Sequence, residues 1–155
     1  MIIERLGHLL EIERILFLDC AHKEEALLTL TDNLGNSPEV KNKAELTKAI
    51  FHRETLMSTG IGLGLGIPHV RLESVKNLTM SIGVCQHPLL DYDSIDRKPV
   101  ELIFMIAAGK EQHAEYLKVL AFISSKLKSE ELRKKLLSAK NAESFYQLLM
   151  KEPCR

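Results

Sequence analysis

The chain has 155 residues, of which 45% are hydrophobic and 27% are charged, and this composition is typical of a folded globular protein. The length suits one ordinary domain, so we expect residues 1–155 to form a single domain. Lys and Arg together number 21, as do Asp and Glu, which leaves no strong net charge to hold nucleic acid or an anionic membrane surface.

The first third of the chain predicts one strand and two helices. The apolar run 15–18 is typical of a short strand, and residues 23–34 place apolar side chains at helical spacing. Asn42, with Glu45 three residues later, predicts a capped start for a second helix. We expect this second helix to carry Arg53 near its end.

A glycine-rich segment, residues 58–69, comes next. Glycine occupies every second position from 60 to 66, which allows close approach to a ligand and turns that a side chain would forbid. The segment ends in Pro68-His69. Because proline fixes its own backbone angle and restricts the residue before it, we expect the histidine to be presented on a constrained backbone.

The rest of the chain predicts two strands and three helices. Residues 78–84 alternate as in a half-buried strand, and residues 100–108 are nearly all apolar, as in a strand covered on both faces. Residues 110–127 predict a largely buried helix, and Ser129 and Asn141 are expected to cap two further helices. The apolar positions of the 110–127 helix are Ala114, Leu117, Leu120 and Ala121 on one face, broadened by Tyr116, Val119, Phe122 and Ile123.

Strands that alternate with helices predict an α/β fold: a single-domain sandwich with a mixed β-sheet covered by helices on both faces. The apolar stretch 100–108 is far shorter than the roughly 20 residues that a membrane-spanning helix needs. The amino terminus lacks the pattern of a secretion signal. We therefore expect a cytoplasmic protein that is not inserted in a membrane.

Metal and disulfide chemistry find no support in the sequence. Three scattered cysteines form no CxxC pair and are expected to be reduced structural thiols; they are Cys20, Cys85 and Cys154. Four histidines lack supporting spacing and are interpreted as surface or boundary residues; they are His8, His22, His52 and His87. No HxxxH or HExxH pattern occurs, so we expect no zinc site.

Nucleotide binding is also disfavoured, although glycine-rich segments often hold phosphates. The dinucleotide fingerprint requires glycine where Leu65 and Ile67 stand, and no Gly-Lys-Ser/Thr follows as a P-loop would require. A predicted helix, rather than a strand, precedes the segment. On the residues alone, His69 stays open between a structural and a reactive role.

The segment Ser58-Thr59-Gly60-Ile61-Gly62-Leu63-Gly64-Leu65-Gly66-Ile67-Pro68-His69 resembles the motif S-T-G-I-G-x-G-I-A-I-P-H. That motif is typical of the IIA components of the bacterial phosphoenolpyruvate-dependent phosphotransferase system, of the fructose, mannitol and nitrogen-regulatory type (EIIA type 2). Arg53 before the motif, the Asp-x-x-Pro-Val segment at 96–100 and His113 at a helix start also resemble the family.

The resemblance implies a phosphoryl carrier without a cofactor. His69 would accept the phosphoryl group of HPr or an HPr-like protein, and Arg53 would stabilise the phosphoryl oxygens. His113 would bond the same oxygens from the first turn of its helix. Ser58 and Thr59 would either add hydroxyl donors for the phosphate or only cap and turn the chain.

Two downstream roles are open under this resemblance. In one, His69 passes the phosphate to the cysteine of a sugar-specific IIB protein. In the other, phosphorylation alters binding to a regulatory target, as in the nitrogen-related members. The second is slightly favoured because the sequence ends at Arg155 without an appended IIB or membrane domain.

The chain departs from the family pattern at four positions, which bear on the partner that it recognises. These departures are Leu63 where Asn is frequent, Gly66 where Ala is frequent, Val70 where Gly or Ala is frequent, and Gly109 where Pro is common.

Overall fold

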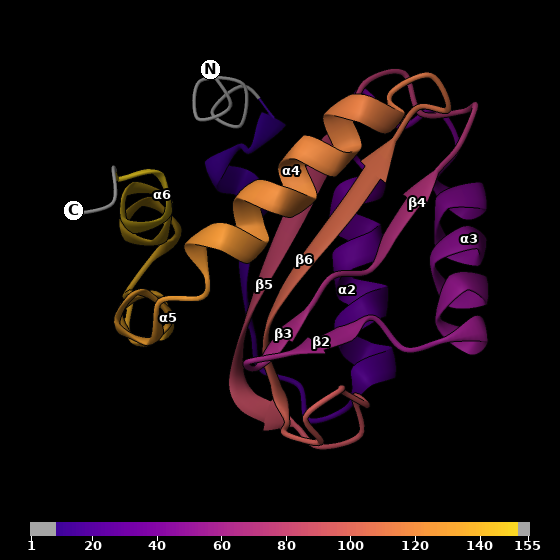
Figure 1. Cartoon of the computed structure of the whole chain (residues 1–155). Helices are drawn as coiled ribbons and strands as arrows, with labels where there is room; N and C mark the ends of the chain where they lie inside the picture. Colours follow the sequence, from indigo (N-terminus) through magenta and orange to yellow (C-terminus); the bar gives the residue numbers. More distant parts are fainter. Residues whose placement is uncertain (1–8, 152–155) are drawn as a thin grey trace.

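The computed structural model describes residues 9–151 as a mixed six-stranded sheet with helices on both faces (Figure 1). The strands are β1 (Ile15–Leu18), β2 (Gly60–Gly62), β3 (Leu65–Gly66), β4 (His69–Arg71), β5 (Thr79–Leu89) and β6 (Val100–Ala108). The helices are the 3-10 turn η1 (Ile12–Arg14) and the α-helices α2 (Lys23–Gly35), α3 (Lys43–Leu56), α4 (His113–Lys126), α5 (Glu130–Leu137) and α6 (Ala142–Met150). The predicted α/β sandwich is confirmed.

The long strands β5 and β6 form the antiparallel centre of the sheet. β1 lies parallel to β5 on one side, while β3 and β4 follow one another along β6, both parallel to it. Leu65 is opposite Leu102 and His69 is opposite Ile106, so the chain stays beside β6 as it passes from β3 to β4. This pairing fixes the backbone on both sides of the Pro68-His69 pair.

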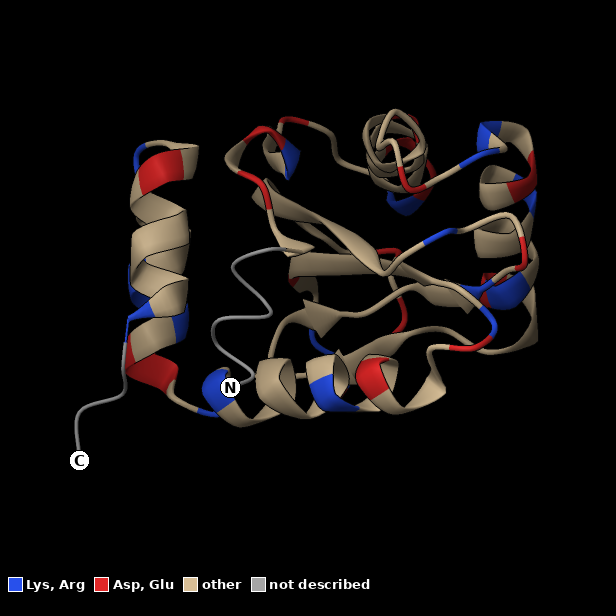
Figure 2. Cartoon of the chain, turned by 90° about the horizontal axis from the view of Figure 1, so that it is seen from above, with Lys and Arg blue, Asp and Glu red and all other residues tan. Residues whose placement is uncertain are grey.

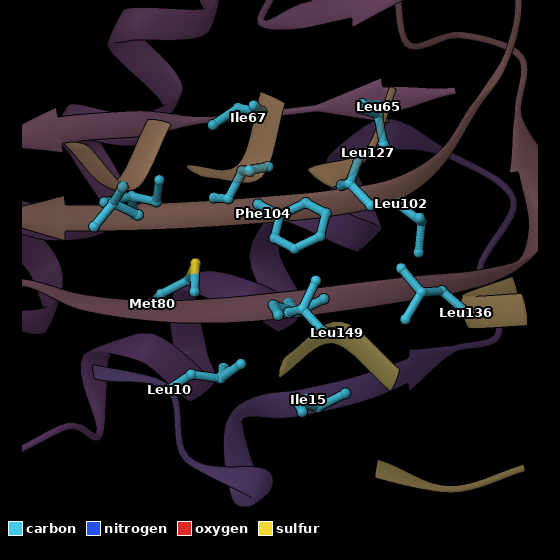
Figure 3. Close-up of a cluster of buried hydrophobic side chains, with 14 of the residues drawn as sticks. Leu10, Ile15, Leu65, Ile67, Met80, Leu102, Phe104, Leu127, Leu136 and Leu149 are labelled. Carbon is cyan, nitrogen blue, oxygen red and sulfur yellow. The ribbon is translucent and has the colours of Figure 1, made fainter. Parts of the chain in front are cut away.

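Two hydrophobic cores cover the two faces of the sheet. One lies under α2 and α3 and includes Leu30 and Ile50. The other lies under the helices α4, α5 and α6. Figure 3 shows Phe104 of β6 in the middle of this core, to which α5 contributes Leu136 and α6 contributes Leu149. The sheet is therefore buried on both faces, as the sequence predicts.

The exposed face of α4 differs from the sequence prediction. The helix turns Tyr116, Val119 and Ile123 into the core, whereas Leu117 keeps 49% of its surface exposed. Ala114 and Ala121 are exposed as well. The prediction of a largely buried helix was wrong, because apolar residues occupy more of its circumference than the sheet covers.

The strand predicted at 78–84 is longer and more deeply buried than expected. β5 continues to Leu89 and is buried at every position from Thr79 to Cys85, because α2 covers one face and the C-terminal helices cover the other. The prediction of a half-buried strand was therefore wrong. Its polar positions include Ser81, whose Oγ donates a hydrogen bond to Asn33 Oδ1 at 2.7 Å.

The predicted helix caps are confirmed. The side chain of Asn42 accepts a hydrogen bond from the amide of Glu45 at 3.0 Å at the start of α3. Ser129 and Asn141 cap α5 and α6 in the same way.

Charged residues lie mainly on the helices and loops, with both signs intermixed, while the strands are nearly free of them (Figure 2). Within residues 9–151, none of the helices has the length and apolar character required to cross a membrane.

Candidate functional site

His69 is the first residue of β4 and is half-buried. The carbonyl of Pro68, just before it, accepts a hydrogen bond from the amide of Ile106 at 2.9 Å, which fixes the backbone against the central strand. The imidazole Nδ1 lies 2.6 Å from the carbonyl oxygen of Ile67. Since a carbonyl only accepts, Nδ1 must carry the hydrogen in this contact, which leaves the lone pair of a neutral ring on Nε2.

The surroundings of His69 favour the neutral ring. Burial lowers the pKa of His69 below its ordinary value, and the positive charge of Arg53 lowers it further. The hydrogen bond to the Ile67 carbonyl and the negative charge of Glu54 act in the opposite direction. The net lowering keeps the imidazole uncharged, and hence nucleophilic, at neutral pH.

Arg53 and His69 line the same pocket, which is open to solvent and has a volume of about 470 Å³. Arg53 lies near the end of α3, as predicted, and its Nη1 donates a hydrogen bond to the carbonyl of Met57 at 2.8 Å. The pocket is also lined by Ile95 from the loop after β5 and by Leu120 from α4. Residues from α3, β4, the loop after β5 and α4 thus line one pocket.

His113 opens α4, as predicted, and is exposed. It is not among the residues that line the pocket. The ring of Tyr116 lies near both histidines, with its centroid 5.4 Å from that of His69 and 6.3 Å from that of His113. Both histidines therefore lie close to one ring, that of Tyr116, while His113 is outside the lining of the pocket.

Tyr116 is largely buried, with 7% of its surface exposed. Burial raises the pKa of its phenol, and the charges of Arg53 and Arg71 lower it. Arg71 lies two residues after His69 in β4, so the two side chains point to the same face of the strand. Arg53 therefore acts electrostatically on both Tyr116 and His69, whereas Arg71 acts on Tyr116.

Ser58 and Thr59 also line the pocket, but both hydroxyls have protein partners. Ser58 Oγ donates to the carbonyl of Asp93 at 2.6 Å. Thr59 is 4% exposed, and its Oγ1 donates to Glu54 Oε2 at 2.7 Å and lies 2.6 Å from the hydroxyl of Tyr92. These contacts tie the start of the glycine segment to α3 and to the loop after β5.

The glycine segment forms a β-hairpin, β2 and β3, which the sequence did not predict. Its turn uses the left-handed region at Gly62, Leu63 and Gly64, with φ of 95°, 60° and 77°. The side chain of Asp96 holds this turn, because its Oδ2 accepts a hydrogen bond from the amide of Leu63 at 3.0 Å. Hydrogen bonds from backbone amides, first that of Leu63 and then that of Lys98, lower the pKa of Asp96.

Gly66 leaves room for the ring of Tyr92. A Cβ atom at this position would lie 2.8 Å from the Cζ and hydroxyl oxygen of that ring. Tyr92 is 1% exposed, and its hydroxyl contacts Thr59. Glycine at position 66, where the family motif has alanine, therefore allows Tyr92 to pack directly against the hairpin.

Glu54, Tyr92 and Tyr116 are the parts of this site that the sequence reasoning missed. Glu54 follows Arg53 in α3, and its largely buried carboxylate pairs with Lys23 at 2.9 Å. The adjacency of Glu54 to Arg53 and the spacing of Tyr116 three residues after His113 were available signals. Nothing local in the sequence pointed to Tyr92.

The other described histidines lie at the surface, as predicted. His22, His52 and His87 are exposed, and Cys20 and Cys85 are free thiols. Burial raises the pKa of Cys85 to about 12. Over residues 9–151, no cluster of His, Cys, Asp and Glu is arranged to hold a metal ion. His8 and Cys154 lie outside the described residues.

A mixed sheet between two helical layers, with one histidine in the lining of a solvent-open pocket, defines a small α/β protein. The chain belongs to the family described as "Phosphoenolpyruvate-dependent sugar phosphotransferase system, EIIA 2", whose model matches residues 8–152. Components of this family are phosphotransferase proteins.

Individual relatives fall in both branches of the family. The PTS system fructose-specific EIIA component of Haloferax volcanii is 34% identical over 132 residues, which are 83% of either chain. The PTS system fructose-specific EIIABC component of Bacillus subtilis is 32% identical over 85% of this chain, but only 21% of that protein is covered. This chain thus spans about a fifth of the length of such curated relatives.

Among solved structures, the crystal structure of the Nitrogen Regulatory Protein IIA-Ntr from Neisseria meningitidis matches with a TM-score of 0.86 at 28% identity, covering 94% of this chain and 99% of that one. Similarity to fructose-specific and nitrogen-regulatory proteins alike establishes the family without separating the two branches.

Proposed function

We propose that this protein is a cytoplasmic phosphoryl carrier of the phosphotransferase system and that His69 accepts its phosphoryl group from HPr or an HPr-like protein. The observation that carries the proposal is the contact of 2.6 Å between His69 Nδ1 and the Ile67 carbonyl, beside a pocket open to solvent. That contact leaves Nε2 as the nitrogen able to attack phosphorus.

The transfer exchanges one nitrogen–phosphorus bond for another. The lone pair of Nε2 attacks phosphorus, and the bond between phosphorus and the donor imidazole breaks, with its electron pair returning to the donor nitrogen. His69 keeps its proton on Nδ1, so the phosphorylated ring gains positive charge. The Ile67 carbonyl, 2.6 Å from Nδ1, stabilises that charge by accepting its hydrogen bond.

Arg53 is proposed to stabilise the transferring group. It lines the pocket together with His69 and carries a permanent positive charge. The hydrogen bond of Nη1 to the Met57 carbonyl orients the guanidinium and leaves most of its five N–H donors for phosphoryl oxygens.

His113 is proposed as a further donor to the phosphoryl oxygens, from the first turn of α4, where the helix field favours negative charge. For Thr59, the burial of its hydroxyl between Glu54 and Tyr92 supports a role in holding the turn rather than in binding phosphate. The bond from Ser58 Oγ to Asp93 supports the same role for Ser58.

Two downstream roles follow from this chemistry. We favour the regulatory role, in which the charge added at His69 changes binding to a target, and the similarity to IIA-Ntr at a TM-score of 0.86 supports it. The alternative is transfer to the cysteine of a IIB protein for sugar uptake, supported by the 34% identity to a fructose-specific EIIA component.

The primary test is phosphorylation of the purified protein with phosphoenolpyruvate, enzyme I and HPr, followed by intact-mass spectrometry. We expect one acid-labile phosphoryl group on the wild type and none on His69→Ala. His52→Ala, which changes an exposed histidine, is the matched control and should be labelled like the wild type. A wild type that stays unlabelled by every HPr-type donor of its organism would overturn the proposal.

A second experiment separates the downstream roles. The phosphorylated protein is mixed with the fructose-type or mannitol-type IIB proteins of its organism, and loss of its phosphoryl group is followed. Rapid transfer to a IIB cysteine would establish the sugar-uptake alternative. Retention of the phosphate with all of them is the result expected for the regulatory role.

A further inference from the structure

Glu54 lies directly after Arg53 in α3, but its carboxylate points away from solvent, with 6% of the side chain exposed. One oxygen, Oε1, accepts a hydrogen bond from the amide of Thr59 at 3.2 Å and lies 2.9 Å from Lys23 Nζ. The other, Oε2, accepts the hydroxyl of Thr59 at 2.7 Å. A single carboxylate therefore holds both the backbone and the side chain of Thr59.

Thr59 is in turn linked to His69 by two further hydrogen bonds. The carbonyl of Thr59 accepts the amide of Ile67 at 3.0 Å, across the hairpin formed by β2 and β3. The carbonyl of Ile67 then contacts His69 Nδ1 at 2.6 Å. A continuous series of hydrogen bonds thus runs from Glu54 through two backbone segments to the imidazole.

The stability of the fold gives little reason to bury this charge. A buried ion pair such as Glu54 with Lys23 loses much of its attraction to the cost of removing both groups from water, and an apolar pair of similar size is often equally stable. The same carboxylate also favours positive charge on the His69 ring, and the ring acquires such charge when Nε2 bonds phosphorus.

We propose that Glu54 is a positioning residue for His69: by fixing Thr59 and, through it, Ile67, it keeps Nδ1 protonated and Nε2 free for phosphoryl transfer. The catalytic consequence rests on the proposed function of His69. The effect on the tautomer of His69 is independent of that function, because the tautomer can be observed in the unphosphorylated protein.

The test removes the buried pair without leaving a lone charge, in the double variant Lys23→Met with Glu54→Leu. We expect the 15N shifts of His69 in the unphosphorylated protein to move from a single tautomer, with Nδ1 protonated, to a mixture of both. We expect the rate of phosphoryl transfer to fall by about 10- to 100-fold, as misplacement of a reacting group does. Glu73→Gln, at a carboxylate whose side chain is 83% exposed, is the control and should change neither measurement.

A second pair of variants tests the middle of the series without touching the ion pair. Thr59→Val removes the hydroxyl that bonds Glu54, and Thr59→Ser keeps it. The valine variant should shift the His69 signals in the direction of the double variant, and the serine variant should restore them. Wild-type tautomer signals in both the double variant and Thr59→Val would overturn the positioning role, whatever the phosphorylation assay shows. A wild type that takes no phosphate would overturn only the proposed function.

Discussion

The Nδ1 atom of His69 lies 2.6 Å from the carbonyl oxygen of Ile67, two residues earlier in the chain. Pro68 separates the two residues, and its fixed backbone angle helps to set this geometry. The pairing of β3 and β4 along β6 holds the segment on both sides of Pro68. The contact assigns different roles to the two ring nitrogens: Nδ1 donates to the protein, and Nε2 is left for chemistry.

The rate of phosphoryl transfer should depend on the protonation state of the His69 ring. Burial, followed by the charge of Arg53, holds the pKa of His69 below its ordinary value of 6.5. Phosphoryl transfer should therefore decline with falling pH only at a lower pH than a histidine of ordinary pKa would allow, as the His69 ring becomes protonated. A titration of the His69 ring by NMR measures this pKa directly. Arg53→Ala removes a neighbouring positive charge and should raise it.

The same shift predicts the direction of a stability change. The unfolded chain binds a proton at His69 more readily than the native protein does. The contribution of the neutral ring to the free energy of unfolding is therefore fully present above pH 6.5, the ordinary pKa of histidine. That stability should be lost as pH falls from 6.5 through the lower native pKa. Urea unfolding across this range would show the trend, and His69→Ala should remove this part of it. An upward-shifted pKa of His69 would contradict the electrostatic account of the site.

Substitution of Arg53 should affect transfer far more than folding. Arg53→Ala removes the guanidinium that faces the pocket, and we expect transfer to slow by about 10²-fold, the usual cost of losing one donor to a developing anion. The variant should still unfold cooperatively. Arg133→Ala is the control, because Arg133 caps the carbonyl of Leu127 on a different part of the surface. An unchanged transfer rate in Arg53→Ala would show that Arg53 has no such role.

Gly66→Ala should destabilise the protein, although alanine is frequent at this position in the family motif. The new Cβ would lie 2.8 Å from the ring of Tyr92, which would have to move and weaken its contact with Thr59. We expect a loss of about 1 to 3 kcal/mol in the free energy of unfolding. In a Tyr92→Leu background the same substitution should cost much less. Equal costs in the two backgrounds would show that the steric explanation is wrong.

Leu63→Asn should stabilise the protein. Leu63 has a φ of 60°, in the left-handed region that costs a residue with a branched side chain about 1 kcal/mol and that asparagine tolerates. The side chain is 48% exposed, so little buried area is lost. Leu117→Asn, at a residue of 49% exposure within α4, is the matched control and should destabilise, because asparagine is a poorer helix former. Urea unfolding midpoints compare the two.

The elements with strong local signals were predictable from sequence. The caps at Asn42, Ser129 and Asn141 each involve a hydrogen bond between residues three positions apart, so a short window contains the whole signal. The central strand β6 is apolar at every position except Glu101, because helices cover it on both faces. These features were sufficient to predict the α/β sandwich.

Two features of the fold depended on tertiary structure. The hairpin β2–β3 was missed because its glycines carry no strand signal and its turn is held by Asp96, more than thirty residues away. The buried face of α4 was misassigned because Leu117 and Val119 are both apolar, and periodicity alone does not decide which of them meets the sheet. Contact with β5 and β6 makes that choice.

In the candidate site, too, some residues were predictable from sequence, whereas the contacts between them depend on the tertiary structure. His69 and Arg53 were identified from the motif and its spacing, and the structure brings both to one pocket. The contacts that orient them were not predictable, because Glu54 reaches Thr59 only once the chain has turned after α3. The hydroxyl of Tyr92 arrives from 33 residues beyond Thr59.

The most direct test of the account is to determine which atom carries the phosphoryl group, by 15N and 31P NMR on protein phosphorylated through phosphoenolpyruvate, enzyme I and HPr. The account predicts one phosphorus bonded to Nε2 of His69, with the proton retained on Nδ1. Attachment to Nδ1, to another residue, or no attachment at all would contradict it.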